Sequence, residues 1–237
     1  MIGTGTPHGC ARCAGDASRC PRRLPRRGSA ASVAAFLATH GDPIRMHKGR
    51  LEAFSDGVIA ILITIMVLEI KIPQGDTPAA LIPQYPILLS YALSFVFLGI
   101  YWNNHHHMLQ AAKHVDGRAL WANMHLLFWL SLIPFGTAWM GESHFRPWPV
   151  AIYGVLLLLA ACAYYLLSRV LIAVNGADSK LARALGEDRK GVVSLVLYAV
   201  AVGVALVAPL VSCAIYVLVA IVWLVPDRRI ERALAED

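Results

Sequence analysis

The sequence predicts an all-α polytopic membrane protein with six transmembrane helices, on three observations. Apolar residues make up 57% of the chain and charged residues 15%, with a mean hydropathy of +0.57. Soluble domains are usually about 45–50% apolar and about 25% charged. The apolar residues form runs long enough for a bilayer core of about 30 Å, which requires roughly 20 helical residues. The basic residues lie between these runs, as a membrane topology requires.

Residues 1–45 differ from the remainder and are predicted to form a disordered basic tail. They are rich in Gly, Ala, Ser, Pro and Arg, and they show no sustained apolar periodicity. Met46 offers an alternative start of translation that would leave this tail untranslated. The net charge of +6 is also typical of nucleic-acid-binding proteins, but attraction to anionic lipid explains a basic segment beside a membrane. We therefore expect the lipid bilayer as a partner, and no nucleic acid.

The helices are predicted from the apolar runs in chain order. The first four runs each predict one helix, over Leu51–Ile72, Ile82–Ala112, Ala119–Met140 and Val150–Val174. The last run, Val192–Val225, is too long for one helix. It is interrupted at Ala208 and Pro209, so it predicts a hairpin of two short spans.

The orientation of the helices follows from the basic residues in the connections. With the N-terminus inside, all of the 21 lysines and arginines except Lys71 and Arg146 lie on the cytoplasmic side. The sequence thus predicts a multi-pass protein of the cell membrane with both termini in the cytoplasm. Residues 46–227 form its six-helix transmembrane domain, and residues 228–237 form a short cytoplasmic C-terminus.

The first predicted helix carries polar side chains, which are costly in lipid and mark function or internal pairing. They are Ser55, Asp56, Thr64 and Glu69. Asp56 lies near the helix N-terminus, where a carboxylate is favoured by the free amides and the helix dipole. A structural role for Asp56 is therefore favoured over direct contact with a passing ion.

The same helix carries an apolar stripe whose 4-3-4-3-4 spacing places its members on one face. The stripe consists of Phe54, Val58, Ile61, Ile65, Leu68 and Ile72, with Thr64 beside it. Periodicity alone favours a packing seam. The alternative is that this face lines a narrow pore, which gates by dewetting and has a hydroxyl next to the apolar positions to help a dehydrated cation.

The second predicted helix ends in three consecutive histidines, His105, His106 and His107. Neighbouring residues on a helix diverge by about 100°, and chelation by one helix favours i, i+4 spacing. Neither these three histidines nor His114 and His125 contain such a pair. We therefore expect no metal site.

One or two of these histidines are expected to point into the bundle and hydrogen-bond Asp56, Ser55 or Arg50 of the first helix. His125, in the third predicted span, is expected to belong to the same interior network. The chain contains no HExxH, GxSxG, P-loop or GxGxxG motif. We therefore expect neither enzymatic activity nor a cofactor.

The first helix opens with Arg50, three further residues and then Phe54-Ser55-Asp56, followed by a long apolar run. This pattern resembles the prokaryotic branch of the transmembrane protein 175 family of potassium channels. The resemblance extends from Met46 to about Asp227, although the 45-residue tail is not part of the family pattern. It implies a homotetrameric channel of six-helix subunits, in which four copies of the first helix line the pore.

The resemblance also implies roles for particular residues. Ile61 corresponds to a narrow isoleucine constriction, Ile65 and Leu68 to the next apolar layers, and Thr64 to a polar contribution to selectivity. The residues implied in a structural network that holds the helices in register are Arg50, Phe54, Ser55, Asp56, Trp102 and either His105 or His106.

The predicted function is passive, potassium-selective conduction without a cofactor, with K⁺ ions, further copies of the chain and the bilayer as partners. The alternative is a proton-coupled secondary transporter that uses Asp56 and the cluster His105–His107. Such transporters often show inverted repeats and broken midplane helices, and neither is evident in this sequence. A third interpretation is a membrane scaffold in which the apolar stripe only packs.

Overall fold

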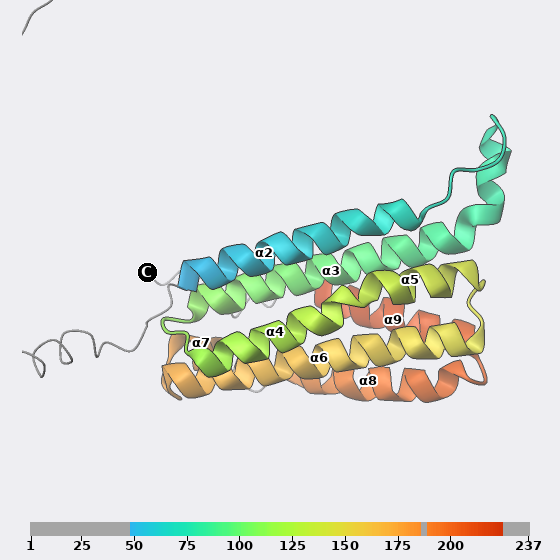
Figure 1. Ribbon diagram of the computed structural model, residues 1–237. Coiled ribbons are helices and arrows are strands. Elements are labelled where there is room, and N and C mark those ends of the chain that lie inside the picture. Colours follow the sequence, from blue (N-terminus) through green and yellow to red (C-terminus); the bar gives the residue numbers. More distant parts are fainter. Residues whose placement is uncertain (1–47, 186–188, 225–237) are drawn as a thin grey trace, which may run out of the picture. The chain divides into compact units, whose positions relative to one another are not determined.

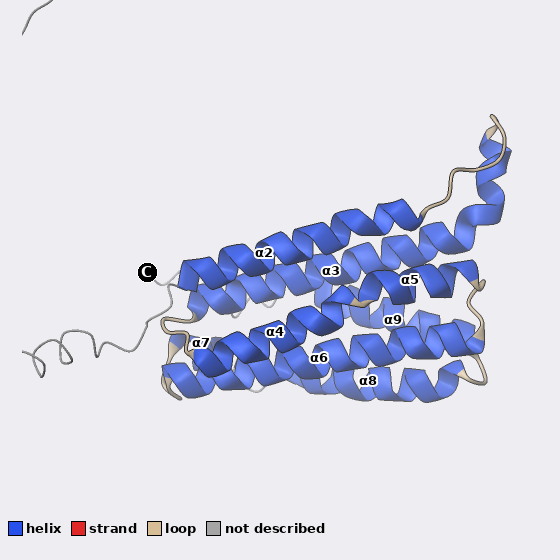
Figure 2. Ribbon diagram, in the orientation of Figure 1, coloured by secondary structure: helices blue, strands red, loops and turns tan. Residues whose placement is uncertain are grey.

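The computed structural model describes residues 48–185 and 189–224, and the regular elements in these ranges are helices (Figure 1). Figure 2 shows no strand among the described residues, which agrees with the predicted all-α class. The predicted tail and the C-terminal residues 228–237 lie outside the described residues. Four described segments are long and apolar enough to cross a membrane: Lys48–Glu69, Pro78–Ala111, Gly117–Glu142 and Pro147–Asn175.

The first of these segments is α2 (Lys48–Ile65), which tightens into the 3-10 helix η1 (Met66–Glu69). The helix ends before Ile70, whose backbone is extended with φ −79° and ψ 110°. This end lies before the predicted one at Ile72. Just beyond it, Lys71 Nζ forms an ion pair of 2.7 Å with Glu142 Oε1, and both side chains are exposed.

The second segment begins as the 3-10 helix η2 (Pro78–Gln84) and continues as α3 (Tyr85–Ala111). Pro86 lies in the first turn of α3. The N–H groups of a first turn have no acceptor within the helix, so a proline, which lacks this group, breaks no helical hydrogen bond there. The helix ends at Ala111 because Ala112 is extended. Its last two turns carry the consecutive histidines.

The third predicted helix is two helices in the structure, α4 (Gly117–Ser131) and α5 (Ile133–Glu142). The interruption falls at Leu132, just before Pro134 in the first turn of α5. A proline inside a helix lacks the N–H donor and its ring crowds the carbonyl one turn earlier, so a regular helix does not continue through it. The run is one candidate membrane span, as predicted, but the expectation of an uninterrupted helix was wrong at Leu132.

The remaining described helices are α6 (Pro147–Asn175), α7 (Lys180–Leu185), α8 (Arg189–Ala205) and α9 (Pro209–Leu224). The predicted interruption of the last apolar run is present, since α8 ends before it and α9 starts with its proline. The 16-residue α9 is apolar but shorter than the four segments named above.

The long helix α6 lies at the centre of the packing and contacts α4, α5, α8 and α9. Buried hydroxyls join α3, α5 and α6: Ser94 Oγ lies 2.8 Å from Tyr153 Oη and 2.6 Å from Thr137 Oγ1. Helix α2 instead packs chiefly against α3 and α4, and in Figure 1 it runs along α3 at the border of the bundle. This position leaves one face of α2 uncovered by the rest of the subunit.

Candidate functional site

The two faces of the first helical segment have opposite environments. The side chains that face the subunit are buried: Leu51, Ser55, Ile59, Leu62 and Met66. The apolar stripe lies on the other face, where Ile61, Ile65 and Leu68 are 61%, 44% and 77% exposed. Val58 is the one member of the stripe that is partly buried against the core. The stripe is therefore not a packing seam within the subunit.

Thr64 lies on the same exposed face as the stripe. Its hydroxyl is directed back along the helix, with the carbonyl oxygens of Ala60 and Ile61 each 3.0 Å from Oγ1. Threonines in helices commonly make this bond to the preceding turn. Because the helix holds the hydroxyl proton, the lone pairs of Oγ1 are left to accept a donor or to contact a cation.

A buried chain of hydrogen bonds links the starts of α2 and α4 to the end of α3. Asn123 Nδ2 donates to Ser55 Oγ at 2.9 Å, and Ser55 Oγ donates to the carbonyl of Leu51 at 2.9 Å. His105 Nε2 lies 2.7 Å from Asn123 Oδ1. An amide oxygen only accepts hydrogen bonds, so His105 Nε2 carries the proton. Ser55, His105 and Asn123 are fully buried, and the chain fixes three helices at one depth.

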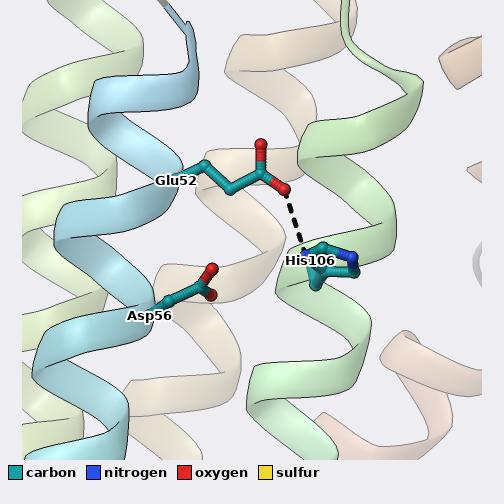
Figure 3. Close-up of side chains that lie close together, drawn as sticks. All are labelled: Glu52, Asp56 and His106. Carbon is teal, nitrogen blue, oxygen red and sulfur yellow. Dashed lines mark ion pairs between the residues drawn. The ribbon is translucent and has the colours of Figure 1, made fainter.

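A second group of polar side chains joins α2 to α3 nearer the surface (Figure 3). Trp102 Nε1 donates to Asp56 Oδ1 at 3.1 Å. Glu52 Oε1 lies 3.0 Å from His106 Nδ1, and the Trp102 and His106 rings stack with centroids 5.8 Å apart. Glu52 and Asp56 are four residues apart, so they project from the same face of α2 toward His106.

The structure places five residues named for the predicted network in these two groups: Ser55 and His105 in the buried chain, and Asp56, Trp102 and His106 in the second group. The other two members, Arg50 and Phe54, are exposed, and Arg50 makes no hydrogen bond or ion pair with another described residue.

The expectation for His125 was wrong. His125 lies on the exposed side of α4, where Trp129 Nε1 donates to its Nε2 at 2.9 Å. The polar side chain that α4 turns inward is Asn123. Two residues correspond to about 200° of rotation on a helix, so Asn123 and His125 face nearly opposite ways.

Sequence reasoning also missed Glu52. Its signal was available, because Glu52 and Asp56 have the i, i+4 spacing that was sought only among the histidines. With His106 they offer three ligand atoms that all lie within 4.8 Å of one another. The spacing of the histidines excludes chelation by one helix, but it does not bear on ligands that come from two helices.

Long apolar helices, with ionisable side chains paired between them, define the chain as a polytopic membrane protein. The family model described as "Endosomal/lysosomal potassium channel TMEM175" matches residues 50–134. A potassium channel of Chryseobacterium sp. is 51% identical over 192 residues, which cover 81% of this chain and 100% of that protein. The chain belongs to the TMEM175 family.

Two further relatives agree with this assignment. A potassium channel of Streptomyces collinus is 36% identical over 128 residues, covering 49% of this chain and 61% of that one. The crystal structure of a lysosomal potassium-selective channel TMEM175 homolog from Chamaesiphon minutus superposes with a TM-score of 0.66 at 28% identity, covering 76% of this chain and 97% of that chain. The described helices therefore have the fold of the TMEM175 channels.

Proposed function

We propose that this protein is a passive, potassium-selective channel rather than an enzyme, and that it assembles as a homotetramer with four copies of α2 around the pore. Two observations support the proposal. The relatives described above are named potassium channels, and the apolar stripe of α2 is exposed in the subunit.

The exposed stripe is the observation that carries the proposal. The segment buries one face against its own subunit, so the opposite face must meet lipid or other copies of the chain. Four copies around one axis would stack rings of Leu68, Ile65 and Ile61 along a central path. A single subunit cannot form such a path, because its α2 lies at the border of the bundle.

The chemistry of the face suits a hydrophobic gate. A ring of isoleucines at Ile61 is narrow and apolar, and water leaves such a constriction readily, which sets a closed state without any moving plug. Thr64 lies beside the rings with its hydroxyl proton held by the helix. Its oxygen lone pairs can replace part of the hydration shell of a cation that enters, which supports a contribution of Thr64 to selectivity.

The proposed subunit has six spans with both termini in the cytoplasm. The two shortest, α8 and α9, contain 17 and 16 residues. At 1.5 Å per residue they are about 24–26 Å long, slightly less than a hydrocarbon core of about 30 Å. The packing of α8 against α6, and of α9 chiefly against α8, supports their position inside the membrane. The distribution of basic residues supports the orientation.

Potassium efflux from liposomes that contain the purified protein tests this function. We expect efflux from wild-type liposomes and a several-fold increase with Ile61→Asn, because a polar ring keeps the constriction hydrated. Ile221→Asn is the matched control, since Ile221 is an exposed isoleucine of α9 outside the stripe. Absence of efflux, or equal behaviour of the two variants, contradicts the proposal. Flux that requires a proton gradient supports the proton-coupled transporter instead.

A further inference from the structure

We propose that Glu52, Asp56 and His106 form a binding site for one zinc ion between α2 and α3. The proposal concerns binding and does not depend on conduction. Its ligands are two carboxylates and one imidazole, and a water molecule would complete a four-coordinate shell. Three protein ligands plus water is a common arrangement for zinc in proteins.

The positions of the three ligand atoms fit this ion. Bond lengths of about 2.0–2.2 Å at a tetrahedral zinc ion place ligand atoms roughly 3.4 Å apart. The atoms offered by Glu52, Asp56 and His106 lie within 4.8 Å of one another, and the Glu52 and His106 atoms are 3.0 Å apart. Small rotations of the carboxylate side chains bring the set to ligand distance. Figure 3 shows all three side chains directed into one space between the helices.

The imidazole of His106 presents its Nδ1 atom to this space. Its Nδ1 is buried and has no hydrogen-bond partner among the described residues, although Glu52 Oε1 lies at ion-pair distance. The other ring nitrogen, Nε2, lies 2.8 Å from the amide nitrogen Nε2 of Gln110, which donates in this orientation of the amide. Histidine ligands of metals usually bond a polar group through their second nitrogen, which fixes the ring. With its amide turned to present Oε1, Gln110 supplies that support.

The carboxylate of Asp56 is supported in the same way. Trp102 Nε1 donates to Oδ1 of Asp56 and leaves Oδ2 available to an ion. The indole also stacks on the His106 ring, with 18° between the planes. Two of the three ligands are thus oriented by neighbours before any ion binds, which lowers the entropic cost of assembling the site.

The local charge favours a divalent cation. Glu52 and Asp56 make no ion pair with a lysine or arginine among the described residues. Lys48, one turn before Glu52, is instead directed to the carbonyl oxygens of Gln110 and Ala112, at 3.0 and 3.1 Å. The two carboxylates offer a charge of −2, which one divalent ion neutralises. The imidazole favours zinc over calcium and magnesium, which prefer all-oxygen sites.

Zinc bound to the purified full-length protein tests the site. The protein is treated with EDTA, equilibrated with zinc chloride and desalted, and zinc per subunit is measured by elemental analysis. Glu52→Gln and His106→Gln are each expected to lose one zinc ion per subunit. The matched controls, Glu69→Gln on the same helical segment and His125→Gln on α4, are expected to retain it. Cysteines of the N-terminal tail are common to all variants, so any zinc that they bind cancels in the comparison.

A supporting change separates a metal site from a purely structural role. Gln110→Ala removes no ligand, but it is expected to weaken zinc binding about 10–100-fold, as loss of an outer-shell partner does. Zinc is also expected to raise the melting temperature of the wild type and not that of Glu52→Gln, a variant of nearly unchanged shape. Equal zinc in Glu52→Gln and Glu69→Gln, with the same zinc-induced shift in melting temperature, overturns the proposal.

Discussion

The indole N–H of Trp102 donates a hydrogen bond of 3.1 Å to Oδ1 of Asp56 and so joins the last turns of α3 to the first half of α2. Trp102 and Asp56 are far apart in the sequence, and most residues of the two helices that carry them are apolar. In lipid, a directional bond of this kind fixes the rotation of one helix against another, which apolar packing alone does weakly.

Replacement of Trp102 by phenylalanine is expected to lower the stability of the protein by about 1 kcal/mol, because Asp56 loses a charge-assisted hydrogen bond that is only partly shielded from solvent. The measurement is the midpoint of thermal unfolding in detergent. Trp121→Phe is the matched control, since Trp121 is exposed on α4 and makes no hydrogen bond with another described residue. An equal shift in both variants would show that the bond contributes nothing.

Asn123→Ala is expected to be more damaging, by about 1–3 kcal/mol. It leaves the N–H of buried His105 without an acceptor and removes the donor to Ser55, and an unsatisfied buried polar group costs about that much. The half-buried Asn103, which makes no hydrogen bond with another described residue, provides the control variant Asn103→Ala. Unfolding midpoints in detergent compare the two, and a loss in Asn123→Ala no larger than the control's contradicts the role of the buried chain.

Asp116 caps the N-terminus of α4, where its Oδ1 accepts a hydrogen bond of 2.9 Å from the backbone N–H of Ala119, and this cap predicts a dependence of stability on pH. The backbone N–H of Ala119, with help from Arg118, lowers the pKa of Asp116 below its usual value of 3.8. A lowered pKa in the folded state means that the charged carboxylate stabilises the fold above pH 3.8, and that this contribution is lost as the pH falls through the folded-state pKa.

Asp116→Asn keeps a side chain that can cap the helix and removes only the charge. We expect the wild type to be more stable at neutral pH by about 0.5 kcal/mol, a small value because the site is exposed. The difference should vanish in strongly acidic solution. Melting temperatures measured from pH 7 downward check this. Asp76→Asn is the control, since Asp76 is exposed in the connection between η1 and η2. A gap that persists at low pH would show that the charge of Asp116 is not responsible.

The helices of this protein could be located from the sequence because apolar runs of the right length occur between polar connections. The interruption before Pro209 was also predictable, since the apolar run Val192–Val225 is too long for one span. The interruption at Leu132 was not predicted. The apolar run continues through Pro134, and the third span had an ordinary length, so nothing required a division.

The direction of the apolar stripe could not be obtained from the sequence. Periodicity places Ile61, Ile65 and Leu68 on one face, but it does not say whether that face meets the subunit or its surroundings. The answer depends on the position of α2 at the border of the bundle. That position results from the packing of all the helices.

The polar contacts were only partly predictable, because they too depend on how the helices pack. The signature at Asp56 and the aromatic and histidine residues at the end of α3 were recognisable as a group. The identity of the partners was not, because the rotation of α4 decides whether Asn123 or His125 faces inward. Glu52 was missed because the search for ligands considered histidines alone.

The two ends of α2 are attached by bonds of different character. Buried hydrogen bonds through Asn123 hold its start, whereas the segment after it is tied to α5 by the exposed ion pair of Lys71 and Glu142. Dissolved ions screen an exposed pair strongly and a buried one little. A rise in ionic strength should therefore weaken the contact of Lys71 with Glu142 and leave the hydrogen bonds of Asn123 intact, so that, within the described part of the chain, the far end of this segment would be held by buried apolar side chains such as Met66 alone.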